Sequence, residues 1–288
     1  SSALAFYILS KETRKHVTVA LSGDGADEMF AGYNKHLAEY RTRKLSLIIP
    51  LLQLSSPILN ILPKSRNSKY GNFFRQLDRF IKGANLPKSE RYWIWCTYAN
   101  LNETLPILKN KPDLNDYIHR KNKTLSHITT KGDMNEFFYT DMHLVLQGDM
   151  LVKADLMSMA NSLEVRVPFL DHELVNFMFT LPPEYKINKY GRKFILKQTF
   201  GHLLPEELLK RSKHGFEVPL LKWFRTDLKN TIEFDLLSES FIKEQNIFNY
   251  SEILKLKQKL FSSNPGDSVA RIYGLIVFQH WYKKYYNK

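Results

Sequence analysis

The 288-residue sequence has the composition of a folded protein, because 43% of its residues are hydrophobic and 25% are charged, which excludes a disordered chain. The formal net charge of +13 suits an anionic partner, but the lysines and arginines form no run of five or more and no nucleic-acid fold motif occurs. The single cysteine, Cys96, excludes an internal disulfide framework, and no uncharged apolar stretch reaches the roughly 20 residues that span a membrane, so we expect a cytoplasmic protein with neither nucleic acid nor membrane as its partner.

The predicted elements begin with a helix at 3–15 and a β-prone apolar run at 17–21, typical of a buried parallel strand whose partners we expect upstream. Residues 28–62 have a helical pattern with a break at Pro50, and 63–71 form a polar loop. Ser251 and Asp171 are expected to cap helices. Further helices are expected at 73–82, 88–97, 136–150, 153–160, 172–180, 193–200, 205–210, 219–226, 251–261 and 268–282. The sequence therefore predicts a mainly α fold.

A glycine-rich acidic string at 22–28 (SGDGADE) follows the predicted strand and opens a helix. Glycines allow a ligand to approach the backbone, and the free amides at a helix start favour phosphate. Three carboxylates in one turn would repel bare phosphate, so they fit Mg²⁺ that bridges to phosphate oxygens, or acid and base groups. The alternative is a capped turn with acidic residues in the first helical turn.

A second segment, 151–172, alternates charged and apolar residues. Glu164 and Arg166 flank Val165 in an extended stretch, so both side chains are expected on one face, where they would pair or orient a carboxylate ligand. Asp171 and His172 are expected to start a helix and not to bind a metal, because no third ligand stands at a suitable spacing.

Two basic stretches follow, at 191–197 and 210–219, and the second contains Lys213. A cationic loop before a glycine would cover polyphosphate, and a lysine ammonium would neutralise a developing oxyanion. The alternative is a solvated basic loop, and the segment by itself leaves both interpretations open.

The ordered set of motifs resembles the asparagine synthetase B family of amidotransferases. The set comprises the 22–28 string, Phe30-Ala31-Gly32-Tyr33, SLEVRVPFLDH at 162–172 and Lys213-His214-Gly215-Phe216. The last predicted helix, with RIYGLIVFQHW at 271–281, is similar to the family's closing helix, so the likeness covers nearly the whole chain. It implies one partial synthetase domain, 1–288, derived from an adenine nucleotide α-hydrolase-like α/β fold. Residues 1–35 would be the remnant of its parallel sheet with the second phosphate loop, and 36–288 a helical part.

The resemblance implies an ATP- and Mg²⁺-dependent ligase that converts aspartate to asparagine. The β-carboxylate would attack ATP, release pyrophosphate and form β-aspartyl-adenylate, which ammonia from glutamine then attacks. Asp24 looks like the acidic residue near the amide-forming step, and Asp27 like the residue that meets Mg²⁺ and pyrophosphate. Lys213 looks like the lysine that stabilises phosphate or tetrahedral charge. The positions similar to the nucleotide-binding backbone are Ser22, Gly23 and Gly25, and those similar to the substrate region are Lys153, Asp155, Glu164 and Arg166.

Two features of the family do not occur in the sequence: the pyrophosphate loop Ser-Gly-Gly-x-Asp-Ser, and an N-terminal catalytic cysteine with its glutaminase domain. We therefore expect a carboxy-terminal fragment that is inactive by itself, and a homodimer stays open. One alternative is a related amidotransferase that acts on another carboxylate, such as a sugar acid, a β-lactam precursor or a lasso peptide. The other is a non-catalytic scaffold protein.

Overall fold

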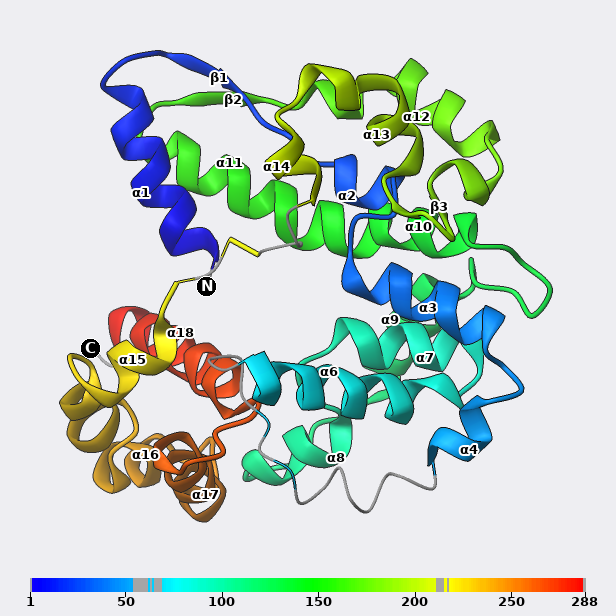
Figure 1. Ribbon diagram of the computed structural model, residues 1–288. Helices are drawn as coiled ribbons and strands as arrows, with labels where there is room; N and C mark the ends of the chain where they lie inside the picture. Colours follow the sequence, from blue (N-terminus) through cyan, green and yellow to red (C-terminus); the bar gives the residue numbers. More distant parts are fainter. Residues whose placement is uncertain are drawn as a thin grey trace. The chain divides into compact units, whose positions relative to one another are not determined.

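The computed structural model describes residues 2–53, 62, 64, 69–210, 215–216 and 218–286. Within these ranges the chain is mainly helical, as predicted, with two small two-stranded sheets (Figure 1). It divides into two compact units. Unit one comprises Ser1–Leu47, Pro87–Tyr92 and Tyr117–Val218, and unit two comprises Ile48–Leu86, Trp93–Asp116 and Pro219–Lys288. This division does not coincide with the boundary expected at residue 35, and a single functional domain stays a prediction.

Unit one holds both sheets and most of the sequence motifs. Helices α7 (Lys88–Cys96) and α9 (Asn115–Leu125) contribute residues to both units. The other elements of unit one are α1 (Ser2–Arg14), β1 (Val19–Leu21), α2 (Ala26–Met29), α3 (Asn34–Lys44), α10 (Asn135–Asp141), the π-helix η2 (Met142–Met150), α11 (Leu151–Met159), β2 (Glu164–Arg166), η3 (Pro168–Leu170), α12 (His172–Thr180), η4 (Pro183–Tyr185), β3 (Ile187–Asn188), β4 (Gly191–Arg192), α13 (Phe194–Phe200), η5 (Gly201–Leu203) and α14 (Glu206–Lys210).

Strands β1 and β2 form a parallel pair, with Val19 opposite Glu164 and Leu21 opposite Arg166. Helix α11 packs beside β2, and α1 packs against α11 (Figure 1). Val19 and Leu21 are nevertheless 38% and 73% exposed. The prediction of a buried strand is therefore wrong, because the face that carries Val19 and Leu21 is open. One strand partner, β2, lies within the chain, and further partners upstream stay a prediction.

The connection from α11 to β2 is a Schellman motif. Ser162 has a left-handed φ of 55°, its backbone N–H donates to Met159 O at 2.9 Å, and Leu163 N–H donates to Ser158 O at 3.1 Å. These two bonds satisfy the last carbonyl groups of the helix. The motif reverses the chain, so that the next residues enter β2.

The core of unit one surrounds α2 and the residues that follow it. Ala26, Met29 and Phe30 are buried together with Met178 of α12. A second cluster consists of Ala31, Met134, Phe138 and Ile187. Burial of these side chains fixes the helix that follows the 22–28 string.

The hairpin β3–β4 was not predicted. Its strands have two residues each and pair Ile187 with Arg192 and Asn188 with Gly191. The turn is stabilised by Tyr190 N–H, which donates to Asn188 Oδ1 at 2.9 Å, and Gly191 adopts a φ of 126° that favours glycine. The hairpin leads directly to Lys193, the residue before α13.

Lys186 lies at the base of this hairpin and is fully buried. Its ammonium donates to Asn135 Oδ1 at 2.6 Å and lies 4.7 Å from the ring centroid of Phe179 and 5.5 Å from that of Phe138. Burial lowers the pKa of Lys186 from 10.5 to about 8, although Asp133 acts in the opposite direction. A partly compensated cation is thus enclosed in the aromatic core.

In its described part unit two contains helices and one isolated antiparallel bridge, between Leu108 and Phe248. Besides the shares of α7 and α9, its elements are α4 (Ile49–Gln53), α6 (Lys69–Ala84), α8 (Leu101–Thr104), η1 (Leu105–Ile107), α15 (Leu220–Arg225), the π-helix η6 (Thr231–Leu236), α16 (Glu239–Gln245), α17 (Tyr250–Phe261) and α18 (Ser268–Tyr285). Ile242, Ile253 and Ile272 are fully buried in its core. Gln245 and Gln279 are buried there too, and their amides exchange two hydrogen bonds of 2.7 and 3.0 Å.

Most predicted helices are present within a few residues, and α12 has the predicted bounds. The segment 136–150 is α-helical only to Asp141 and continues as a π-helix. Helices α8, α9, η6 and α16 were not predicted. Ser251 lies inside α17 and is not its N-cap, which is Asn249, whereas Asp171 caps α12 through its Oδ1. Part of the predicted loop 63–71 lies outside the described residues, and α6 begins at Lys69.

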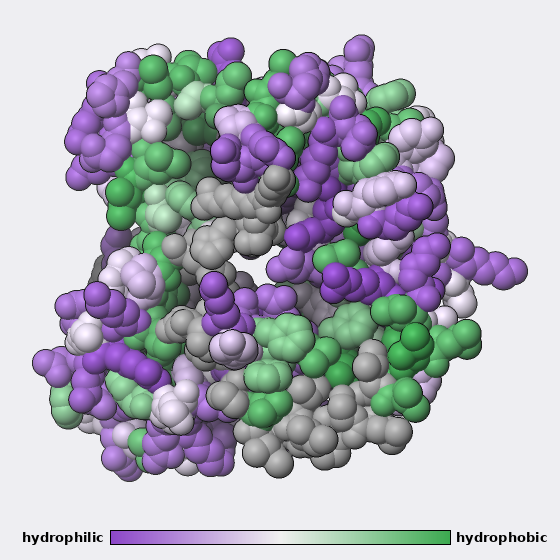
Figure 2. Space-filling model, viewed as in Figure 1, coloured by the Kyte–Doolittle hydropathy of each residue, from purple (hydrophilic) through white to green (hydrophobic). Residues whose placement is uncertain are grey.

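The visible surface mixes hydrophilic and hydrophobic side chains (Figure 2). Among the exposed apolar side chains, Leu47 is 94% and Leu51 is 70% exposed, around the start of α4. Within the described ranges, no helix has both the length and the apolar character that a membrane span requires.

Candidate functional site

The residues of the 22–28 string form the turn between β1 and α2 and the first three residues of α2. Ser22 N–H extends the sheet by donating to Arg166 O at 2.8 Å. The Ser22 hydroxyl donates to Asp24 Oδ2 at 2.5 Å and accepts from Asp24 N–H at 3.3 Å. Gly23 is exposed, and a Cβ there would meet no atom within 4 Å. The turn therefore holds the Asp24 carboxylate in place and leaves the backbone at Gly23 open.

Gly25 is required by the turn. Its φ is 89°, and a Cβ at this position would overlap the side chain of Leu170. A left-handed conformation costs an L-residue about 1–2 kcal/mol before any overlap is counted. Gly25 therefore permits the sharp entry into α2 that places Asp27 in its first turn.

Asp27 forms an ion pair with Lys193. Lys193 Nζ lies 2.5 Å from Asp27 Oδ1, with 31% of the lysine side chain and 18% of the aspartate side chain exposed. The backbone of the aspartate is also held, since Asp27 O accepts from Gly32 N–H at 2.7 Å. A Cβ at Gly32 would overlap both the Asp27 carboxylate and the Lys193 stem, so this glycine makes room for the pair.

Lys193 reaches this position through strained backbone. Its φ is 54°, and its N–H donates to Phe30 O at 3.0 Å. Ala31, on the facing loop, has a left-handed φ of 60°. Left-handed non-glycine residues cost about 1–3 kcal/mol each and cluster at functional sites. The neighbouring Arg192 donates to Gly32 O at 2.9 Å and Asn34 Oδ1 at 2.7 Å, which joins the hairpin to the same loop.

Glu28, the residue after Asp27, is buried and accepts from the Tyr33 hydroxyl at 2.6 Å. Burial raises the pKa of the Glu28 carboxyl, and the bond from Tyr33 only partly opposes this. Burial and the neighbouring Glu28 also raise the pKa of Tyr33, so its hydroxyl stays a donor. The carboxyl side chain is therefore part of the internal structure and is not available to a ligand.

Asp141 is the centre of a buried polar network that includes two residues of α3. It accepts from Lys35 Nζ at 2.5 Å and from the Tyr92 hydroxyl, and its Oδ2 lies 2.7 Å from His36 Nε2. Burial acts to raise the pKa of Asp141, but Lys35 and His36 outweigh it and hold the pKa at about 2. Burial lowers the pKa of His36, whose Nδ1 accepts from Tyr33 N–H at 3.4 Å, so we assign a neutral ring with the proton on Nε2.

The sequence-predicted pair Glu164 and Arg166 lies on β2. Arg166 Nε lies 2.8 Å from Glu164 Oε1, with side chains 64% and 55% exposed. The prediction that both lie on one face is confirmed. The register of β2 on β1 places this pair beside the strand that ends at Leu21, directly before Ser22.

The remaining predicted residues are less informative. Lys153 and Asp155 lie on α11. Lys153 Nζ lies 3.3 Å from Met150 Sδ and 5.7 Å from the ring centroid of Phe6, and Asp155 is exposed. Lys213 lies outside the described residues. The structure thus unites the 22–28 turn with β2, and roles for Lys153, Asp155 and Lys213 stay predictions.

Asp27 is the residue that could hold Mg²⁺. Within the described part of the chain, no group of three or more His, Cys, Asp or Glu could hold a metal ion. Mg²⁺ does not require such a group, because it is commonly bound by one or two carboxylates together with water and substrate phosphate. A cation already lies against Asp27 Oδ1, and Gly32 leaves the space for it, so the site fits a metal shared with phosphate.

The sequence prediction missed Lys193 as part of this site. The available signal was a turn-forming Tyr190-Gly191 followed by two basic residues, Arg192 and Lys193. The sequence analysis placed Arg192 and Lys193 only in the basic stretch 191–197. The residues around them do not show that the hairpin brings the chain back to Gly32.

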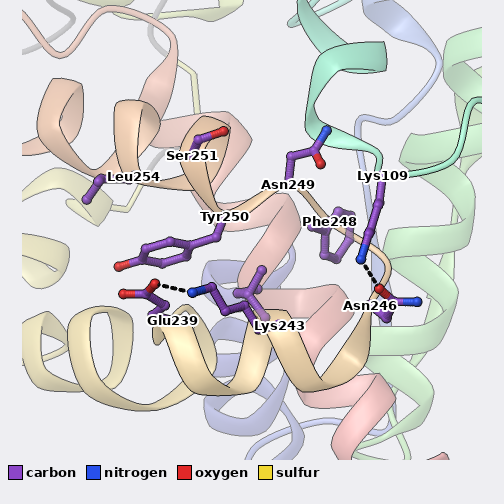
Figure 3. A pocket seen from close by; sticks show the side chains of 10 residues that line it. Lys109, Glu239, Lys243, Asn246, Phe248, Asn249, Tyr250, Ser251 and Leu254 are labelled. Atoms are coloured by element: carbon purple, nitrogen blue, oxygen red, sulfur yellow. Dashed lines mark hydrogen bonds and ion pairs between the residues drawn. The ribbon is translucent and has the colours of Figure 1, made fainter.

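Unit two contains a separate open cavity of about 700 Å³ (Figure 3). Phe248 and Tyr250 line it together with Lys109 and Lys243. Lys109 binds Asn246 Oδ1, and Lys243 Nζ lies 2.6 Å from Glu239 Oε1. No sequence-predicted site residue is among its described lining residues.

Nearly the whole chain is similar to known proteins. The family model described as asparagine synthase matches residues 1–283. Asparagine synthetase [glutamine-hydrolyzing] 1 of Bacillus subtilis is 28% identical over 285 residues, 98% of this chain and 43% of the relative. A putative asparagine synthetase of Mycobacterium tuberculosis is 27% identical over 282 residues, 96% of this chain and 41% of the relative. The chain thus spans less than half the length of these relatives. It belongs to the asparagine synthase family.

Proposed function

We propose that the chain carries part of the synthetase site of an ATP-dependent amide ligase that converts aspartate to asparagine. Membership in the asparagine synthase family supports this proposal, and so do the names of the relatives, which are glutamine-hydrolysing asparagine synthetases. The observation that carries it is the turn between β1 and α2. In this turn two carboxylates are held separately, Asp24 by the Ser22 hydroxyl and Asp27 by a cation.

The two carboxylates would serve different steps. In the first step the β-carboxylate of aspartate attacks the α-phosphorus of ATP, and pyrophosphate leaves. In the second step ammonia attacks the β-aspartyl-adenylate, AMP leaves with the bonding electrons, and the nitrogen loses a proton. Asp24, fixed by Ser22, would accept that proton, and Asp27 would lie at the pyrophosphate.

The other residues of the turn would bind the nucleotide. Gly23, which is exposed and unhindered, would let the backbone approach the α-phosphate and adenosine, and Gly25 maintains the turn. Mg²⁺, when bound at Asp27, would neutralise phosphate charge. Lys213 would stabilise charge on the phosphates or on the tetrahedral species.

We also infer that β1 and β2 belong to a parallel sheet of the adenine nucleotide α-hydrolase type. Parallel sheets are normally covered on both faces, whereas the face with Val19 and Leu21 is open. Further strands and the Ser-Gly-Gly-x-Asp-Ser pyrophosphate loop would complete this sheet. ATP activation would then require polypeptide beyond the 288 residues.

Pyrophosphate release tests the proposal. ATP, aspartate, ammonia and Mg²⁺ are supplied to this chain and to the same chain extended by whatever residues its reading frame encodes upstream. We expect release only from the extended protein, reduced at least about 100-fold by Asp27→Asn or Lys213→Ala. Glu184→Gln, at an exposed carboxylate outside the turn, should keep full activity.

The acceptor specificity is tested in the same assay. Aspartate is replaced in turn by a sugar acid, a β-amino acid precursor of a β-lactam and a peptide carboxylate. Release with one of these and not with aspartate would favour a related amidotransferase. No release with any carboxylate, from either protein, would refute the ligase proposal and favour a scaffold role.

A further inference from the structure

We propose that Lys193 is a built-in counter-ion that a metal–pyrophosphate complex displaces from Asp27 and that then binds a phosphate oxygen. This inference rests on the proposed role of Asp27 and adds a positioning residue to it. The two cations, metal and ammonium, would use the same carboxylate oxygen, Asp27 Oδ1, in alternation. The aspartate would then have a cationic partner both with and without ligand.

The geometry decides which group moves. Asp27 is fixed, because its carbonyl accepts from Gly32 N–H and its carboxylate fills the space that a Cβ at Gly32 would need. The Lys193 backbone is fixed as well, through the bond from its N–H to Phe30 O. The lysine stem is the flexible part, and 31% of its side chain is exposed. A metal that approaches Oδ1 therefore displaces the ammonium and not the carboxylate.

The neighbouring cation cannot make this exchange. Arg192 donates from one nitrogen to both Gly32 O and Asn34 Oδ1, which fixes its guanidinium to the loop. Asp27 is the polar partner that the structure gives to the Lys193 ammonium. Lys193 thus keeps a compact charge at the site on a stem long enough to follow a phosphate that arrives with the metal.

Binding of Mn²⁺ to the 288-residue chain, followed by electron paramagnetic resonance, tests the exchange without any turnover. Mn²⁺ prefers the same oxygen ligands as Mg²⁺. In the absence of pyrophosphate, the Lys193→Met variant should bind Mn²⁺ about tenfold more tightly than the natural chain does, because the substitution removes a competing positive charge. Pyrophosphate should also raise the Mn²⁺ affinity of the variant about tenfold less than it raises that of the natural chain, because the variant has no lysine charge to bind the phosphate.

The opposite signs separate exchange from a structural role. Lys193→Asn serves as a second neutral variant, since asparagine tolerates the left-handed φ of 54°, and Lys189→Met serves as a control at an exposed lysine of the same hairpin. Circular dichroism verifies that each variant is folded. If the natural chain binds Mn²⁺ and both neutral variants bind it equally or more weakly, the exchange is overturned and the role of Asp27 stands. If Asp27→Asn binds Mn²⁺ and pyrophosphate as the natural chain does, the proposed role of Asp27 fails and the exchange fails with it.

Discussion

Because of Lys186, we expect the free energy of unfolding to rise with pH above about pH 8, a range in which most proteins become less stable. Its pKa is about 8 in the folded chain and 10.5 at its ordinary value. Between these values the unfolded chain holds a proton that the folded chain has released, so the free energy of unfolding increases with pH. Each pH unit of a full one-proton difference is worth about 1.36 kcal/mol, and at pH 8 only half of the folded chains have released the proton. We therefore expect a gain of about 1.5 kcal/mol between about pH 8 and pH 9.5.

The measurement is urea unfolding by far-ultraviolet circular dichroism at several pH values, on the natural chain and on Lys186→Met. The methionine has a similar volume and no charge, so its profile should lack the rise between pH 8 and 9.5, and the variant should be more stable below pH 8. Lys189→Met, at an exposed lysine three residues away, should keep the natural profile. Parallel profiles for the natural chain and Lys186→Met would refute the reasoning that a buried, weakly compensated ammonium sets this slope.

Two further predictions concern backbone conformation. Gly25→Ala should destabilise the chain by about 2–4 kcal/mol, because the new methyl would need a left-handed φ and would overlap Leu170, whereas Gly23→Ala, at an unhindered glycine, should change the urea midpoint little. Equal effects of the two substitutions would contradict this account of the turn. Ser162→Gly should stabilise the chain by about 0.5–1 kcal/mol, because glycine adopts the left-handed φ of an exposed Schellman position without strain. A lower thermal midpoint for this variant would show that the serine makes a compensating interaction.

Helices with clear end signals were predictable from sequence alone. The bounds of α12 follow from Asp171, whose carboxylate accepts from the N–H groups of Glu173 and Leu174 at 3.0 and 3.3 Å, and from the prolines that follow its end. The 22–28 turn was predictable too, because its glycines and carboxylates act through local conformation. The extended conformation of Glu164 and Arg166 followed from the alternation of their side chains and from Pro168.

Features that depend on distant residues were not predictable. Nothing near residues 164–166 shows that they pair with β1, since register between strands so far apart is set by the packing of α1 and α11. Lys193 and Asp27 are likewise distant in sequence, and the hairpin that joins them has two residues in each strand, too few for an alternating pattern. The π-helical segment η2 was missed because π-helices are rare and its nine residues are too few to show a period different from that of an α-helix.

The parallel pairing of β1 with β2 has a consequence for synthesis on the ribosome. Residues 19–21 leave the ribosome before their partner, 164–166, which follows only after the helices between them. Until then the edge of β1 that β2 will occupy is unpaired and available to other nascent chains. Closing so long a loop is also slow compared with helix formation. We therefore expect the turn that carries Asp24 and Asp27 to be among the last parts to form, so that aggregation during expression is controlled by how soon β2 docks.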